Sequence, residues 1–103
     1  MIALIEHKQK DKALDIRRVF QASYKIEAEL LGAVHFPPLS RPIEDFYNCP
    51  NDFVGYYEDN KIVAVIEMKN EVSSMHIQSL VVDPDYFRRG IARKLIQFVL
   101  EHY

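Results

Sequence analysis

The basic residues of this chain concentrate around one glycine, in the segment Arg88-Arg89-Gly90-Ile91-Ala92-Arg93-Lys94, where four of seven residues are basic. The segment follows an apolar run that ends at Asp83-Pro84, and it opens a stretch with helical spacing. The first turn of a helix presents backbone N–H groups without intrahelical partners, and these groups attract anions. Gly90 and Ala92 keep side-chain bulk away from such an anion. The pattern predicts a phosphate-binding turn, although a solvated basic helix face fits the same composition.

A second candidate chemistry is proton transfer by His76, because an imidazole accepts a proton near neutral pH. Alternation along a strand over Met75 to Val82 places His76 on one face with Gln78, Leu80 and Val82. If a turn near Asn70 to Ser73 closes a hairpin, Glu67 falls roughly opposite His76. There it would orient the imidazole or act through water. A cross-strand surface pair without catalytic duty explains the same two residues, and both readings stay open.

These residues need a small set of helices and strands to position them. The apolar spacing predicts a strand over Ile2 to Ile5, a helix from Asp11 to Gly32, a stiff Pro-containing loop over Ala33 to Arg41, a short helix from Pro42 to Tyr47, strands over Asp52 to Tyr57, Lys61 to Lys69 and Met75 to Val82, and a final helix from Gly90. The run Ile62 to Ile66 is apolar on both faces, so both sides of the sheet are covered. The expected fold is α+β with α/β-type layers: a mainly antiparallel sheet with helices on both faces, in the order β-α-α-β-β-β-α.

Composition excludes several classes of protein. The 103 residues suit a single domain, 1–103, and 13 − 15 gives a net charge of −2, so nucleic acid is not expected as a general partner. No apolar run reaches the roughly 18 residues of a spanning helix, so no membrane is expected. The single cysteine, Cys49, makes neither an internal disulfide nor a zinc site. We expect a cytoplasmic protein without a metal.

The stretch LVVDPDYFRRGIA resembles the acetyl-CoA-binding motif of the Gcn5-related N-acetyltransferase (GNAT) family, (Gln/Arg)-x-x-Gly-x-(Gly/Ala). Gly90, Ile91 and Ala92 match its second half, while Phe87 stands where the family prefers Gln or Arg, and Arg88 and Arg89 would replace the side-chain contact expected there. The order of elements is also similar to the family's, so the resemblance covers essentially the whole chain. It implies an N-acetyltransferase in which a primary amine attacks acetyl-CoA directly, with no nucleophile from the enzyme.

The resemblance also implies roles for individual residues. The backbone N–H groups of Arg88, Arg89, Gly90, Ile91, Ala92 and Arg93 would hold the cofactor pyrophosphate. The exposed backbone of Leu80, Val81 and Val82 would pair with the pantetheine arm as an extra strand would. His76 lies where histone acetyltransferases of the family carry a catalytic glutamate. The loop His35 to Leu39 would border the acceptor.

Compared with the family, the chain ends at its motif helix, so the resemblance implies a domain that is incomplete at the C-terminus, without the last strands and helix. The strand over Met75 to Val82 would then have an open edge, so we expect either a homodimer through this edge or an exposed edge that makes the fragment poorly behaved. Three functions follow: an N-acetyltransferase or its N-terminal part, a non-catalytic CoA-binding or regulatory remnant, and an RNA-binding module. The last is least favoured, because no strand carries an RNP-like aromatic run.

Overall fold

The computed structural model describes residues 1–32 and 37–103. Over these residues the elements follow the predicted order. They are β1 (Ile2–Leu4), α1 (Lys10–Leu31), the 3-10 helix η1 (Pro37–Ser40), α2 (Glu44–Tyr47), β2 (Asp52–Glu58), β3 (Lys61–Asn70), β4 (Met75–Val82), the 3-10 helix η2 (Pro84–Tyr86) and α3 (Ile91–His102). The predicted stiff loop therefore contains one short turn of 3-10 helix at its two prolines.

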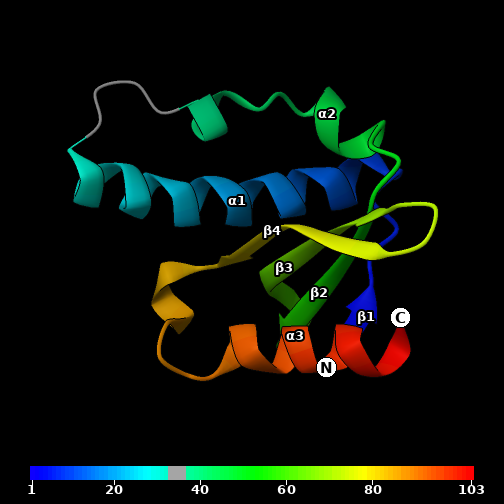
Figure 1. The fold of residues 1–103 in the computed structure, drawn as a ribbon. Helices are drawn as coiled ribbons and strands as arrows, with labels where there is room; N and C mark the ends of the chain where they lie inside the picture. Colours follow the sequence, from blue (N-terminus) through cyan, green and yellow to red (C-terminus); the bar gives the residue numbers. More distant parts are fainter. Residues whose placement is uncertain (33–36) are drawn as a thin grey trace.

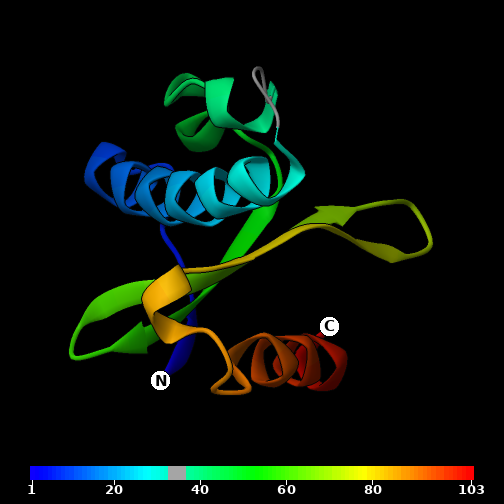
Figure 2. The same cartoon turned by 90° about the vertical axis from the view of Figure 1, so that its left-hand side faces the viewer.

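The sheet has the strand order β1-β2-β3-β4, and every neighbouring pair is antiparallel. Asp59 and Asn60 join β2 to β3 with φ values of 49° and 65°. Two left-handed residues of this kind form the tight turn whose twist matches that of the flanking strands. β3 lies between β2 and β4, and its residues Ile62 to Met68 are all buried. β4 is an edge strand of the described sheet, and the β3–β4 hairpin extends beyond the helices (Figure 2).

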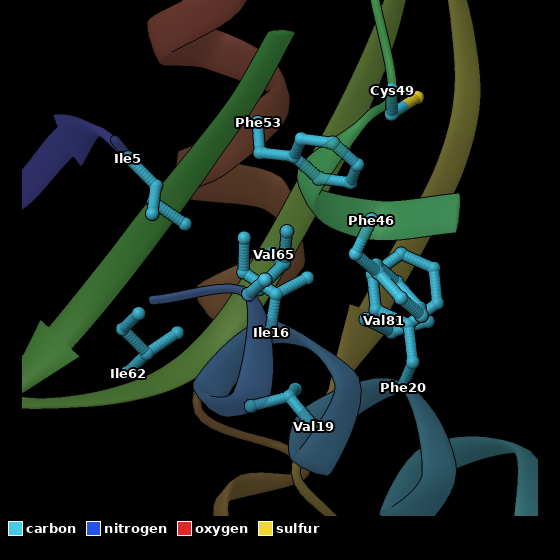
Figure 3. Close-up of a cluster of buried hydrophobic side chains, with 11 residues drawn as sticks. Ile5, Ile16, Val19, Phe20, Phe46, Cys49, Phe53, Ile62, Val65 and Val81 are labelled. Carbon is cyan, nitrogen blue, oxygen red and sulfur yellow. The ribbon is translucent and has the colours of Figure 1, made fainter. Parts of the chain in front are cut away.

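Helices cover both faces of the sheet, as the apolar run in β3 predicts. Figure 1 shows α1 on one face and α3 on the other. The cluster under α1 is shown in Figure 3, and its buried members are Ile5, Ala13, Ile16, Val19, Phe20, Phe46, Cys49, Phe53, Ile62, Val65 and Val81. Those on the α3 face are Val54, Val63, Ala64, Ile66, Met68, Ile91, Leu95 and Val99. Burial of these side chains fixes the sheet between the two helices.

The pairing of β3 with β4 differs from the sequence-based prediction in one respect. Glu67 pairs with Ser79 and His76 with Lys69, because the hairpin closes at Asn70 and Met75, two residues later on β4 than expected, and the register shifts by one further residue between Glu67 and Met68. The extra residue on β4 is Gln78, which forms a β-bulge. The expectation that Glu67 lies opposite His76 is therefore wrong. The bulge also moves His76 off the face that Leu80 and Val82 share, onto the face of Glu67.

Glu67 is 1% exposed, so the alternative of a cross-strand surface pair is wrong as well.

None of the helices in the described ranges is long and apolar enough to cross a membrane.

Candidate functional site

The exit of β4 is anchored to the first helix. The backbone N–H of Asp83 donates to the Val63 carbonyl at 2.8 Å, and the Asp83 carboxylate accepts from the Asp85 N–H at 3.0 Å. Arg18 on α1 lies 3.6 Å from the same carboxylate and donates to the Ile62 carbonyl at 2.8 Å. These contacts hold the start of the loop that leads into α3.

The loop at residues 88–93 has backbone geometry suited to an anion, and we call it the anion-binding turn. Arg88 has φ +65° and Gly90 has φ +72°, so left-handed residues flank Arg89. Within the described part of the chain, the backbone N–H groups of residues 88–93 donate to no acceptor, and no side chain caps α3. Successive free amides at left-handed residues and a helix N-terminus form a concave site for a phosphate. Arg88, Arg89 and Arg93 are exposed around it, and the Arg89 guanidinium lies 5.0 Å from the centre of the Tyr86 ring.

The backbone of Leu80, Val81 and Val82 runs along the outer edge of the sheet. Their side chains point into the core, Val81 under α1 and the other two partly buried on the α3 face. Because β4 pairs only with β3 among the described strands, its other edge has free donors and acceptors. The edge leads from the anion-binding turn back towards Ser79 and Gln78.

A buried carboxylate lies beside that end of the edge. Both Oε atoms of Glu67 accept from Arg41, at 2.9 and 3.1 Å, and Oε2 also accepts from Asn51 at 2.8 Å and from the Cys49 thiol at 3.5 Å. The Arg41 guanidinium lies 4.2 Å from the centre of the Phe46 ring. We call Arg41, Cys49, Asn51 and Glu67 the Arg41–Glu67 cluster. It joins the segment before α2 to the middle of the sheet.

The electrostatics of the cluster keep Glu67 ionised. Burial by itself would raise the pKa of the Glu67 carboxyl, but hydrogen bonds from Arg41 and Asn51 and the charge of Arg41 hold it below the ordinary value. Burial raises the pKa of the Cys49 thiol, and the Glu67 carboxylate adds to this effect. A carboxylate with a lowered pKa is a weak base and a protonated thiol is a weak nucleophile, so the cluster is suited to positioning.

Two pockets lie next to this cluster, and Arg41, Cys49 and Pro50 line both of them. The first has a volume of about 360 Å³, and its lining consists of Arg41, Cys49, Pro50, Asn51, Glu67, Lys69, Gln78 and Ser79. The second has about 330 Å³, and its lining consists of Arg41, Glu44, Asp45, Asn48, Cys49 and Pro50. The first pocket therefore adjoins β4 at Ser79 and Gln78, and the second lies beside α2.

The structure brings together some of the predicted site residues and separates others. Residues 88–93 form one turn, and Leu80 to Val82 lead away from it. Glu67 lies in the first pocket, whereas His76 is exposed and does not line it. Of the predicted acceptor loop, His35 and Phe36 lie outside the described residues, and Leu39 accepts a hydrogen bond from Gln21 through its carbonyl.

The sequence reading missed the partners of Glu67. A carboxylate within the apolar run of β3 signals a buried cation, because an unpaired buried charge is too costly. The signal does not identify which of the 13 basic residues supplies that cation. Among the described residues, no three of the His, Cys, Asp and Glu side chains lie close enough to hold a metal ion.

Comparisons with known proteins agree with this geometry. A profile of the acetyltransferase (GNAT) domain matches residues 38–103. The UPF0157 protein YqkA of Bacillus subtilis (strain 168) is 35% identical over 102 residues, which are 99% of this chain and 30% of YqkA. The chain thus spans about a third of the length of this curated relative.

Two solved structures share the fold. The PaiA N-acetyltransferase of Thermoplasma acidophilum, in complex with coenzyme A, has a TM-score of 0.73 at 16% identity, covering 98% of this chain and 70% of that one. The ribosomal-protein-S18-alanine N-acetyltransferase of Escherichia coli has a TM-score of 0.72 at 15% identity, covering 98% and 57%. The profile match covers well over half of the chain, and the chain therefore belongs to the GNAT acetyltransferase family.

Proposed function

We propose that this domain binds acetyl-CoA and transfers the acetyl group to a primary amine. The observation that carries the proposal is the anion-binding turn at residues 88–93, with six backbone N–H groups that donate to no described acceptor and three exposed arginines. These groups fit a pyrophosphate. The structural neighbour from Thermoplasma acidophilum, crystallised with coenzyme A, supports the same ligand.

The open edge of β4 extends the proposed cofactor site. Amide groups of the pantetheine arm would pair with the backbone of Leu80 to Val82, which requires no particular side chains. The arm would then bring the thioester towards Ser79, where the first pocket begins. The predicted homodimer would use the same backbone groups, so pairing of two copies and binding of the cofactor exclude each other at this edge.

The reaction we propose is direct transfer. The amine nitrogen attacks the thioester carbonyl carbon, the new C–N bond forms as the C–S bond breaks, and the sulfur leaves as a thiolate that takes up a proton. A protonated amine loses one proton before the attack and a second as the amide forms, while one N–H remains on the amide and the thiolate can take up the second proton. Glu67 is a weak base because its pKa is lowered by Arg41, and we therefore propose His76, on the same face of the sheet, as the proton acceptor acting through water.

Thermal unfolding with acetyl-CoA tests the binding part of the proposal. Acetyl-CoA at about 100 times its dissociation constant stabilises a protein by about 2.7 kcal/mol. In a domain of this size, each kcal/mol raises the midpoint by about 4–8 °C. We expect a shift of this kind together with acetylation of a primary amine, detected by release of the CoA thiol. An unchanged midpoint at millimolar acetyl-CoA would refute the proposal, whereas a shift without turnover would indicate a CoA-binding remnant.

Replacing His76 with glutamine tests the proton acceptor. We expect kcat near neutral pH to fall roughly a hundredfold, the lower end of what a positioned base contributes. The difference from the unmodified protein should shrink as the pH rises, because free amine then forms without a base. The pH profile of kcat measures this, with the acetyl-CoA midpoint shift as a control for folding. Parallel profiles in the two proteins would exclude His76 from proton transfer.

A further inference from the structure

We infer that the first pocket is the acceptor subsite and that it selects a small amine carrying an anionic group, a carboxylate or a phosphate, through Lys69. The inference rests on the proposed function, since it requires the thioester to lie at the pocket. It concerns which amine is acetylated. The evidence is the position of the pocket, the distribution of its charges and its size.

The position of the pocket follows from β4. From the anion-binding turn at residues 88–93, one loop and one strand lead back through Val82 to Leu80. They then reach Ser79 and Gln78, which line the pocket. A cofactor held by its phosphates at one end of this path presents its other end to the pocket. Gln78 is also the extra residue of the β-bulge, so the regular pairing of β4 is interrupted at the pocket wall.

The charges of the pocket are unequal. Arg41, Glu67 and Lys69 are its charged lining residues, and the first two neutralise each other through two hydrogen bonds at 2.9 and 3.1 Å. Lys69 is exposed and, within the described residues, makes no ion pair. The pocket therefore has one uncompensated positive charge.

Among the described residues, no carboxylate lies within 4.0 Å of the Lys69 ammonium, including that of Glu71 two residues further along the chain. Its cross-strand partner on β4 is His76, which is not an anion in either protonation state. Asn51, which also lines the pocket, is neutral and donates to Glu67. Asp52 pairs with Met68 and so lies on the opposite face of the sheet, where its carboxylate accepts from Asn70 at 3.5 Å. The pocket itself therefore supplies no anion to pair with Lys69. An anionic group on the acceptor would be that partner.

The dimensions favour a small acceptor. Lys69 and Glu67 are two residues apart on β3, which separates them by roughly 6–7 Å along the strand. An amine at Ser79, the partner of Glu67, and an anion at Lys69 would be separated by a similar distance. A volume of about 360 Å³ lies at the lower end of the range for small-molecule pockets, and it accommodates such a compound.

A matched series of amines tests this inference: β-alanine, phosphoethanolamine, aminopropanol and diaminopropane. We expect kcat/KM to be about tenfold higher for an anionic amine than for aminopropanol, the factor that one modest charge-assisted hydrogen bond provides. Comparing β-alanine with phosphoethanolamine separates carboxylate from phosphate recognition. In Lys69→Gln the preference should disappear through KM, and in Lys69→Glu it should reverse towards diaminopropane.

Lys61→Gln is the matched control, because Lys61 is an exposed lysine at the other end of β3 and lies outside the pocket. It should keep the preference of the unmodified protein. If the protein shows no turnover, the same series is read as the midpoint shift that each amine adds to the CoA-bound protein. A preference for diaminopropane in the unmodified protein would overturn the inference and point to Glu44 and Asp45 of the second pocket. An unchanged preference in Lys69→Gln would overturn it too, whereas failure of the proposed function would appear as a missing acetyl-CoA shift.

Discussion

Replacing Gly90 with glutamate is expected to abolish the rise in unfolding midpoint that acetyl-CoA produces. Gly90 has φ +72° and is the last residue before α3. A Cβ at this position would meet no heavy atom within 4 Å, so the protein itself has room for a side chain. The glutamate carboxylate would, however, occupy the place proposed for the phosphates and repel them. We expect complete loss of the shift, measured by thermal unfolding with and without the cofactor.

Two alanine variants separate charge from backbone strain. Gly90→Ala carries the strain of a left-handed residue without a charge, so it should lower the midpoint of the free protein and keep part of the cofactor shift. Gly32→Ala is the matched control, because Gly32 has φ +64°, also has open space around it and lies at the end of α1. It should lower stability similarly and leave the shift intact. A full acetyl-CoA shift in Gly90→Glu would show that the phosphates bind elsewhere.

Replacing Arg41 with methionine is expected to lower the stability of the domain strongly. The change leaves the carboxylate of Glu67, 1% exposed, without its cation, and breaking a buried ion pair in this way costs about 3–5 kcal/mol. Because the Arg41 side chain is 24% exposed, we expect the lower end of this range, about 3 kcal/mol. Denaturant unfolding measures the loss.

The double variant Arg41→Met with Glu67→Leu is the control for this prediction. Removing both charges should recover most of the lost stability, because an apolar pair of similar size is often as stable as a buried ion pair. Additive losses in the two single variants and the double variant would contradict the coupling. The double variant should also flatten the acid limb of the stability curve.

The direction of that pH effect follows from Glu67. Its pKa in the folded protein is lower than the ordinary value of 4.5, so the unfolded chain binds a proton more readily than the folded one. The contribution of Glu67 to stability is therefore complete above pH 4.5 and is lost as the pH falls from there through the folded pKa.

Patterns local in the sequence predicted the elements of this fold well. The spacing of apolar residues located the strands and both long helices, and Gly32 and Gly90 marked the end of α1 and the start of α3. The turn at residues 88–93 could be predicted because all of its groups are close together in the chain. The family resemblance was also carried by this segment, and the matching domain profile confirms it.

Contacts between distant residues could not be predicted in the same way. The β3–β4 hairpin closes at Asn70 and Met75, so His76 pairs with Lys69, and a bulge at Gln78 then moves His76 to the other face; no strong turn or glycine signal marks either feature. The pairing of Arg41 with Glu67 joins residues 26 apart, and it depends on how the segment before α2 folds back over the sheet. Such contacts follow from packing, which alternation of residue types does not specify.

Adjacent residues of α1 hold the two sides of the proposed site. Arg17 donates to the Arg41 carbonyl at 3.3 Å, beside the pockets, while Arg18 contacts Asp83, where the chain enters the anion-binding turn. Partial opening of α1 in a native-state fluctuation would therefore release the pocket wall and the turn together. In hydrogen exchange, the two regions are expected to behave as one cooperative unit with this helix.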